Sequence, residues 1–269
     1  GDYLAGSKEY RRQTEGSFKK LVSELVDDFD NLPLRDIPRK PQVGVVGEIL
    51  VKYHPDANNH VVDVIEHEGC EAVVPGLMDF LLYCCYNSGY KYKELGNSAI
   101  VAMGGRLGIW AIEKYRHHAN ECLKKTNGKF TPWVHIDYKA ELAKPILNLG
   151  NATGEGWFLT AEMVELIQEG APNIICVQPF ACLPNHVVGK GMVKALRRKY
   201  PESNIVPIDY DPGASEVNQL NRIKLMISTA MKRQAEDLGE TVELRQVQEV
   251  PVDDRGDEMR SLRLVTETE

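Results

Sequence analysis

Short apolar runs alternate with helical patterns of apolar and polar positions along most of this chain. Continuous apolar runs predict β-strands at 42–50, 71–74, 173–177 and 204–209. Apolar positions three or four residues apart predict helices at 58–68, 77–86, 158–169, 187–200 and 215–236. Because strand-helix-strand units cross over with one hand, consecutive strands are expected to be parallel. The pattern predicts an α/β fold with a mainly parallel open sheet and flanking helices, in Rossmann- or flavodoxin-like layers.

Helical patterns without strands occupy two further stretches. One covers residues 7–29, and the other covers 92–123, followed by a short helical region at 137–149. Glycines at 96, 104, 105 and 108 are expected to loosen or break the second pattern. We therefore divide the chain into an N-terminal helical segment at 1–40, a first β-α-β part at 41–90, a helical insertion at 91–150, a second β/α part of the same domain at 151–236, and a polar C-terminal tail at 237–269.

Composition and charge narrow the class of protein. The 269 residues are 43% hydrophobic and 26% charged, which is typical of a soluble globular protein. A net charge of −7 argues against a nucleic-acid surface. No apolar run approaches the roughly 20 residues that span a bilayer, so we expect no membrane partner and a cytoplasmic location. The start without Met and the charge-rich end lead us to expect a piece of a longer protein.

One cysteine stands in a proline-bracketed loop directly after the third predicted strand. Pro179 and Pro184 restrict the backbone on either side of Cys182, so the thiol is expected to have a defined position. This suits a metal-cluster ligand or a reactive thiol, although a small apolar residue packed under a turn fits the same pattern. His186 could act as an acid or base, or simply as a hydrogen-bonding residue at the following helix.

Other candidate residues follow the remaining strands, because sites in parallel sheets gather beyond the carboxyl ends of the strands. Glu48 and His54 come after the first strand, and Asp209 and Asp211 end the fourth, where an ordinary turn is favoured over a metal site. Cys84 and Cys85 lie on an apolar helix, where packing is favoured. A turn before a helix forms a candidate anion nest with the residues Thr153, Gly154, Glu155 and Gly156.

Four sequence motifs together resemble one family. They are Val45–Leu50, Thr153–Trp157 with Leu159–Glu162, the Gln178–His186 loop with Gly189–Met192, and Ile208–Ser215. These motifs resemble the C-terminal, 2-hydroxyacyl-CoA dehydratase-like region of the large CoA-substrate-specific enzyme activase-related proteins of anaerobic bacteria. The resemblance covers roughly residues 40–235.

This resemblance implies an ATP-driven, low-potential electron-transfer system in which an ATPase part with a [4Fe–4S] iron–sulfur cluster passes an electron to a cluster in the dehydratase-like part. Cys182 is the residue carried over as a cluster ligand, and Cys84 or Cys85 is a further candidate. The residues expected to shape the surroundings of the cluster are Glu48, His54, Gln178 and His186. Because the chain has no Walker loop, ATP is not expected to bind this segment.

The further ligands of the family would lie mostly upstream, so any cluster is expected to be incomplete in this chain. The expected partners are ATPase modules of the same longer chain, or a partner subunit. The sequence also leaves open the formation of a homodimer. The alternative is a non-catalytic docking or scaffold domain, in which Cys182 is sealed under Phe180 and Leu183. A third reading is an acyl-CoA or phosphate-ligand domain that uses the 153–156 turn. The sequence leaves open whether the chain is itself an enzyme, and which substrate is involved.

Overall fold

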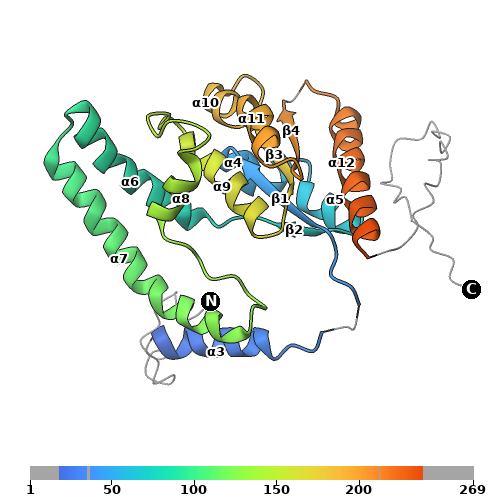
Figure 1. Cartoon of the computed structure of the whole chain (residues 1–269), viewed down its shortest axis with the longest axis horizontal. Helices are drawn as coiled ribbons and strands as arrows, with labels where there is room; N and C mark the ends of the chain where they lie inside the picture. Colours follow the sequence, from blue (N-terminus) through green and yellow to red (C-terminus); the bar gives the residue numbers. More distant parts are fainter. Residues whose placement is uncertain (1–17, 35–36, 212, 239–269) are drawn as a thin grey trace, which may run out of the picture.

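Four parallel strands form the centre of the protein. The computed structural model describes residues 18–34, 37–211 and 213–238. The strands are β1 (Gln42–Gly47), β2 (Glu71–Val73), β3 (Asn173–Pro179) and β4 (Asn204–Tyr210). Their order in the sheet is β2-β1-β3-β4, and every pairing is parallel (Figure 1). The predicted α/β class is confirmed, and the strand order reverses between β1 and β3.

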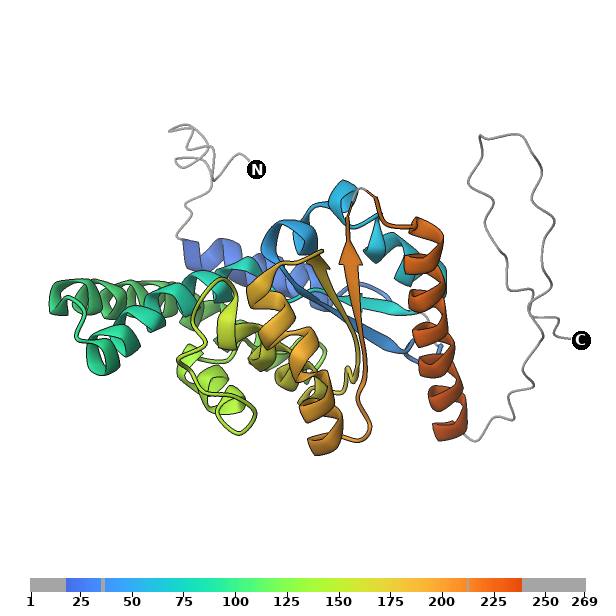
Figure 2. The same ribbon diagram turned by 90° about the horizontal axis from the view of Figure 1, so that it is seen from above.

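Helices cover both faces of this sheet. Val45 and its neighbours on one face pack against α5 (Val61–His67) and α12 (Glu216–Asp237). Val46 and the residues of the other face pack against α9 (Gly156–Gln168) and α11 (Val193–Lys199). Alternate side chains of a strand point to opposite faces, so the continuous apolar strands follow from this burial on both sides. Figure 2 shows α12 and α11 on either side of β4.

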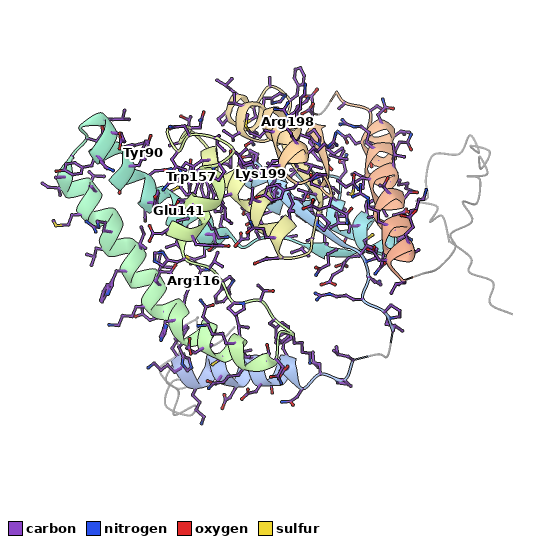
Figure 3. The ribbon with its side chains drawn as sticks, in the orientation of Figure 1. Tyr90, Arg116, Glu141, Trp157, Arg198 and Lys199 are labelled. Carbon is purple, nitrogen blue, oxygen red and sulfur yellow. The ribbon has the colours of Figure 1, made fainter. Side chains whose placement is uncertain are left out.

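A further helical layer lies outside α9. It consists of α6 (Leu77–Leu95), α7 (Ala99–Leu123) and α8 (Ile136–Ala143). Trp157 and Phe158, at the start of α9, form a third core with Tyr83 of α6. Every α9 residue except Gln168 is buried, because α9 packs against the sheet on one side and against this layer on the other. In Figure 3, Trp157 lies where the helical layer meets the sheet.

The α6–α7 hairpin forms an arm that projects from the sheet (Figure 1). The expected break near Gly96 is present, with Gly96 in a left-handed conformation (φ 67°). The other glycines do not break the helix, since α7 continues through Gly104, Gly105 and Gly108. A Cβ at Gly105 would lie 2.5 Å from the carbonyl oxygen of Cys85, so this glycine permits the close approach of the two helices. The helical section begins at Leu77, ahead of the expected boundary at residue 91.

The first predicted strand and the helix predicted at 187–200 have different bounds in the structure. The first strand ends at Gly47 instead of residue 50, because the chain turns there (φ 142°) and Glu48 caps α4 (Ile49–Tyr53). A short 3-10 turn, Pro55–Ala57, follows α4. The helix predicted at 187–200 is divided at Gly189 into α10 (Leu183–Val188), a 3-10 turn (Lys190–Met192) and α11. These divisions place short polar segments at the carboxyl end of the sheet.

An N-terminal helix packs beside the arm. Helix α3 (Phe18–Asp30) lies along the C-terminal half of α7, where Ser23 Oγ is 3.1 Å from His118 Nε2 and Phe18 stacks edge-on against Tyr115. The predicted helix began at residue 7, and its first part lies outside the described residues, as does most of the tail at 237–269. Within the described ranges, none of the helices is long and apolar enough to cross a membrane.

The edge strand β4 is closed by side chains. Its outward carbonyl oxygens accept hydrogen bonds from Arg197 (to Ile205, 2.7 Å), Arg222 (to Pro207, 2.6 Å) and Gln219 (to Asp209, 2.8 Å). Pro207 also removes one N–H from this strand. An exposed strand edge can pair with another strand. The side-chain hydrogen bonds to the carbonyl oxygens of β4 disfavour a further strand at this edge of the sheet.

Candidate functional site

The loops after β1 and β3 meet where the strand order reverses, the position at which open parallel sheets form their crevice. The Glu48 N–H donates to the Val177 carbonyl oxygen at 3.0 Å. A Cβ at Gly47 would lie only 1.8 Å from that same oxygen, so only glycine allows this approach. The Glu48 carboxylate accepts from Val51 N–H at 2.8 Å and thereby caps α4.

Glu155 and Asn185 join three loops at this point. The Glu155 carboxylate accepts from Ile49 N–H at 3.3 Å. In the amide orientation that satisfies both neighbours, Asn185 donates to Glu155 Oε2 at 2.9 Å and accepts from Glu48 N–H at 3.2 Å. Burial raises the pKa of Glu155, and hydrogen bonds from its own N–H and from Ile49 N–H oppose this. The loops after β1, before α9 and after β3 are thus fixed to one another by buried polar contacts.

The turn of residues 153–156 lies against the Cys182 loop. Gly154 (φ 60°) and Gly156 (φ 49°) have left-handed backbones, and a Cβ at Gly154 would lie 3.0 Å from Pro184. Tyr83 Oη donates to the Gly154 carbonyl at 3.0 Å, and Trp157 N–H donates to the Asn151 carbonyl at 2.7 Å. Thr153 is exposed. Because the buried Glu155 carboxylate lies at this turn, an anion there would meet like charge, and anion binding stays an untested prediction.

The Cys182 loop is held by hydrogen bonds while its side chains face outward. Ala181 has a left-handed backbone (φ 62°), and Cys182 N–H donates to the Pro179 carbonyl at 3.2 Å. His186 Nδ1 donates to the Cys182 carbonyl at 2.9 Å. Cys182 is partly exposed, and its neighbours Phe180 and Leu183 are 69% and 73% exposed. The expectation that these two side chains seal the thiol is wrong, because they point to solvent.

A polar cluster lies beside this loop at the ends of β3 and β4. Asp209 accepts from Gln178 Nε2 at 2.6 Å and from Lys190 Nζ at 2.8 Å, and His186 Nε2 lies 3.7 Å from its Oδ1. Burial opposes the charge of Asp209, but the hydrogen bonds from Lys190 and Gln178 lower its pKa. Asp209 therefore anchors the loop. Asp211 is exposed in a turn, where its carbonyl accepts from Ala214 N–H at 2.9 Å.

The remaining candidates, His54, Cys84 and Cys85, lie at the end of α4 and on α6. His54 is exposed, and its N–H ends α4 by donating to the Leu50 carbonyl at 2.9 Å. Cys84 is exposed on α6. Cys85 lies between α6 and α7, where a Cβ at Gly108 would be 3.2 Å from its sulfur. Cys85 is therefore part of the contact between α6 and α7.

Residues 18–34, 37–211 and 213–238 contain no group of three or more His, Cys, Asp or Glu side chains arranged to hold a metal ion. A [4Fe–4S] cluster is usually held by four cysteine thiolates. The described residues therefore do not fit a complete cluster site, and Cys182 presents a partly exposed thiol at this crevice.

Several residues of this region were not predicted as part of the site. Asn185 and Tyr83 bind the loops together, and Lys52 of α4 forms a buried ion pair with Glu162 of α9 at 2.9 Å. Lys52 and Glu162 each interrupt an apolar run, which is a signal that a paired buried charge produces. Asn185 and Tyr83 carry no such signal, because their partners are backbone groups or distant in sequence.

No protein-family model, curated protein or solved structure matches the chain. The family resemblance therefore rests on the sequence motifs.

Proposed function

We propose that this chain is a domain of an ATP-driven, low-potential electron-transfer system related to 2-hydroxyacyl-CoA dehydratase and its activator. Its role is to dock an ATPase module or partner subunit at the carboxyl end of the sheet. At this position the Cys182 thiolate is one ligand of an iron–sulfur cluster, and the ATPase module or partner subunit supplies the other ligands. The family resemblance supports the system, and the geometry of the Cys182 loop supports the docking role.

The observation that carries the docking role is the exposure of apolar side chains around a fixed backbone. Phe180 and Leu183, both largely exposed, flank the partly exposed Cys182 thiol, and neighbouring exposed apolar side chains are typical of an interaction surface. The contacts of Glu155, Asn185 and His186 hold this loop in place. A preformed apolar surface binds with a smaller loss of conformational entropy than a flexible loop.

The incomplete ligand set supports the second part of the proposal. Cys182 presents one partly exposed thiol at the crevice, and the described residues contain no group of three or more side chains arranged to hold a metal ion. This suits a metal site that is shared with a partner subunit or module. His186 and the Asp209 cluster supply hydrogen-bonding groups beside the loop, where they would tune a bound group through second-shell contacts.

Binding to an activase-type ATPase of a 2-hydroxyacyl-CoA dehydratase system tests the docking role. Affinity is measured by interferometry, with and without ATP, for the wild-type chain and for the double variant Phe180→Ser/Leu183→Ser. The dissociation constant is expected to rise at least about tenfold in the double variant, since central apolar contacts dominate interface energies. Leu225→Ser is the matched control, because Leu225 is 72% exposed but lies on α12.

Equal affinity of the double variant and the wild type would contradict the docking role. Alkylation of Cys182 by iodoacetamide gives a second readout, because a docked partner is expected to slow the modification of this thiol. An unchanged rate in a complex that does form would place the partner elsewhere on the chain.

A further inference from the structure

Helix α7 exposes a line of large apolar side chains. Ile100, Met103, Leu107 and Trp110 are between 58% and 77% exposed. Their spacing of three, four and three residues places them on one side of the helix, as in a coiled-coil seam. Gly105 lies on the opposite side, where it contacts α6 through Ser88 and Cys85. We call the four side chains the α7 seam.

The described residues leave this seam without a cover. Helix α3 packs on α7 only near its C-terminal half, where Phe18 reaches Tyr115. Met103 and Trp110 also line an open groove of about 1320 Å³ between the arm and the region of α8. A contiguous apolar line of this kind on a projecting arm is typical of an interaction surface.

The seam is symmetric about Gly105. Ile100 and Trp110 lie five residues on either side of it, and Met103 and Leu107 lie two residues on either side. A second α7 packed antiparallel with its centre at Gly105 would set Ile100 against Trp110 and Met103 against Leu107.

We propose that the α7 seam binds the seam of a second copy of this chain, antiparallel about a two-fold axis at Gly105. A two-fold interface requires a surface that complements itself, and the spacing of these four side chains is the same in both directions along the helix. Gly104, beside the seam, has open space at its Cβ position, which lets a partner helix approach closely.

The preceding segment of the same chain is a poorer occupant of the seam. Residues 1–17 come before α3, whose first residue contacts Tyr115. Their large apolar side chains are Tyr3, Leu4 and Tyr10. Two of these are adjacent, so they do not match four positions at helical spacing.

The proposed axis also brings Arg106 close to its own copy, because Arg106 lies one residue from the centre on the side of the helix next to the seam. Like charges at this separation repel, and salt screens the repulsion. The dimer is therefore expected to become tighter as ionic strength rises, which is unusual for a contact between charged proteins.

Disulfide trapping tests the register. In a Cys84→Ser/Cys182→Ser background, Met103→Cys and Leu107→Cys are purified separately, then oxidised alone and as an equimolar mixture. Each variant alone is expected to stay uncrosslinked, and the mixture is expected to form a covalent dimer, because residue 103 faces residue 107 of the other copy. Crosslinking of Met103→Cys alone, or no crosslinking in the mixture, would overturn the antiparallel register.

Sedimentation velocity over a concentration series tests the dimer itself. Leu107→Glu is expected to raise the dissociation constant at least about 100-fold, since a symmetric dimer loses the contact twice. Leu225→Glu, on α12, is the matched control and is expected to dimerise like the wild type. A wild-type chain that stays monomeric at high micromolar concentration, or a Leu107→Glu variant that still dimerises, would overturn the proposal.

Discussion

Helices α9 and α7 are both rich in apolar residues, yet their surroundings differ. Nearly all of α9 is buried, whereas α7 buries only Ala102, Arg116, Ala119 and Cys122. The difference comes from the layers: α9 lies between the sheet and the helical arm, and α7 contacts neighbours on one side. An apolar pattern therefore indicates a helix, but the number of covered faces depends on what the rest of the chain places around it.

The two helices also differ in the role that we assign to them. Glu155, at the start of α9, fixes the loops around Cys182 through its contacts with Ile49 and Asn185. The α7 seam has no such internal contacts. We therefore assign stability and site geometry to α9, and association to α7.

The largest expected effect comes from a matched pair of tryptophans. Trp157 of α9 is fully buried and donates from Nε1 to Asn87 at 2.9 Å, whereas Trp110 of α7 is 58% exposed. Trp157→Ala is expected to lower the free energy of unfolding by about 3–5 kcal/mol. Trp110→Ala is expected to change it by no more than about 0.5 kcal/mol. Urea denaturation at submicromolar concentration, where a dimer does not contribute, measures both, and equal losses would contradict the assignment.

A similar contrast is expected for two lysines. Lys139 of α8 joins the arm to α9, with its Nζ 2.8 Å from Asp79 Oδ2 and 2.5 Å from Glu165 Oε2. Burial opposes its charge, but Glu165 and Asp79 raise the pKa of Lys139. Lys139→Ala leaves the buried Glu165 without its cation and Asp79 with Arg116 alone, and is expected to cost about 3–5 kcal/mol.

Lys114→Ala is the control, because Lys114 is exposed on α7 over the Trp110 ring. Its expected effect in urea denaturation is below about 1 kcal/mol. A loss for Lys139→Ala as small as that of the control would mean that the buried ion pairs do not hold the arm to α9.

The pH dependence of stability is expected to report on Glu165. Burial raises the pKa of this carboxyl to about 7, although Lys139 opposes the shift. Between about 4.5 and 7 the folded chain keeps a proton that the unfolded chain has lost. Stability should therefore fall as pH rises through this window, by at most about 1.4 kcal/mol per pH unit. Denaturation at several pH values checks this, and Glu165→Gln should remove the fall; an unchanged slope would assign it to other groups.

The smallest of these effects concerns the contact that fixes the site. Glu155→Ala removes the acceptor for Ile49 N–H and the partner of Asn185, and is expected to cost about 1–3 kcal/mol. It is also expected to speed hydrogen exchange in the loops after β1 and β3. Glu94→Ala, at the exposed end of the arm, is the control and should change neither quantity. Faster exchange across the whole molecule would mean that Glu155 stabilises the fold in general.

The fold could be predicted from the sequence because each buried strand produces a continuous apolar run. The end of β1 could not, because Ile49 and Leu50 continue the apolar run while Gly47 turns the chain and Glu48 caps a helix. The glycines of α7 led to the opposite error, because they predict a break in a helix that is continuous. Gly105 instead permits the close contact between α7 and α6.

The candidate site was predictable only in part. The 153–156 turn and the Cys182 loop do lie together, because both adjoin the carboxyl end of the sheet. Cys85 lies at the contact between α6 and α7. This contact depends on how the two helices pack, which no local pattern in the sequence encodes. The hydrogen bonds of Glu155 and Asn185 could not be predicted either, because they join loops that are distant in the sequence.

Anaerobic reconstitution with iron and sulfide, followed by visible absorption and EPR, tests the central claim most directly. The samples are the chain alone, its complex with an activase-type ATPase of a 2-hydroxyacyl-CoA dehydratase system, and the same complex with Cys182→Ala. We expect no [4Fe–4S] signal from the chain alone. The wild-type complex is expected to gain a cluster signal beyond that of the ATPase, and Cys182→Ala is expected to lose this signal while binding persists. A signal that survives Cys182→Ala, or a complex that forms without any added signal, would contradict the account.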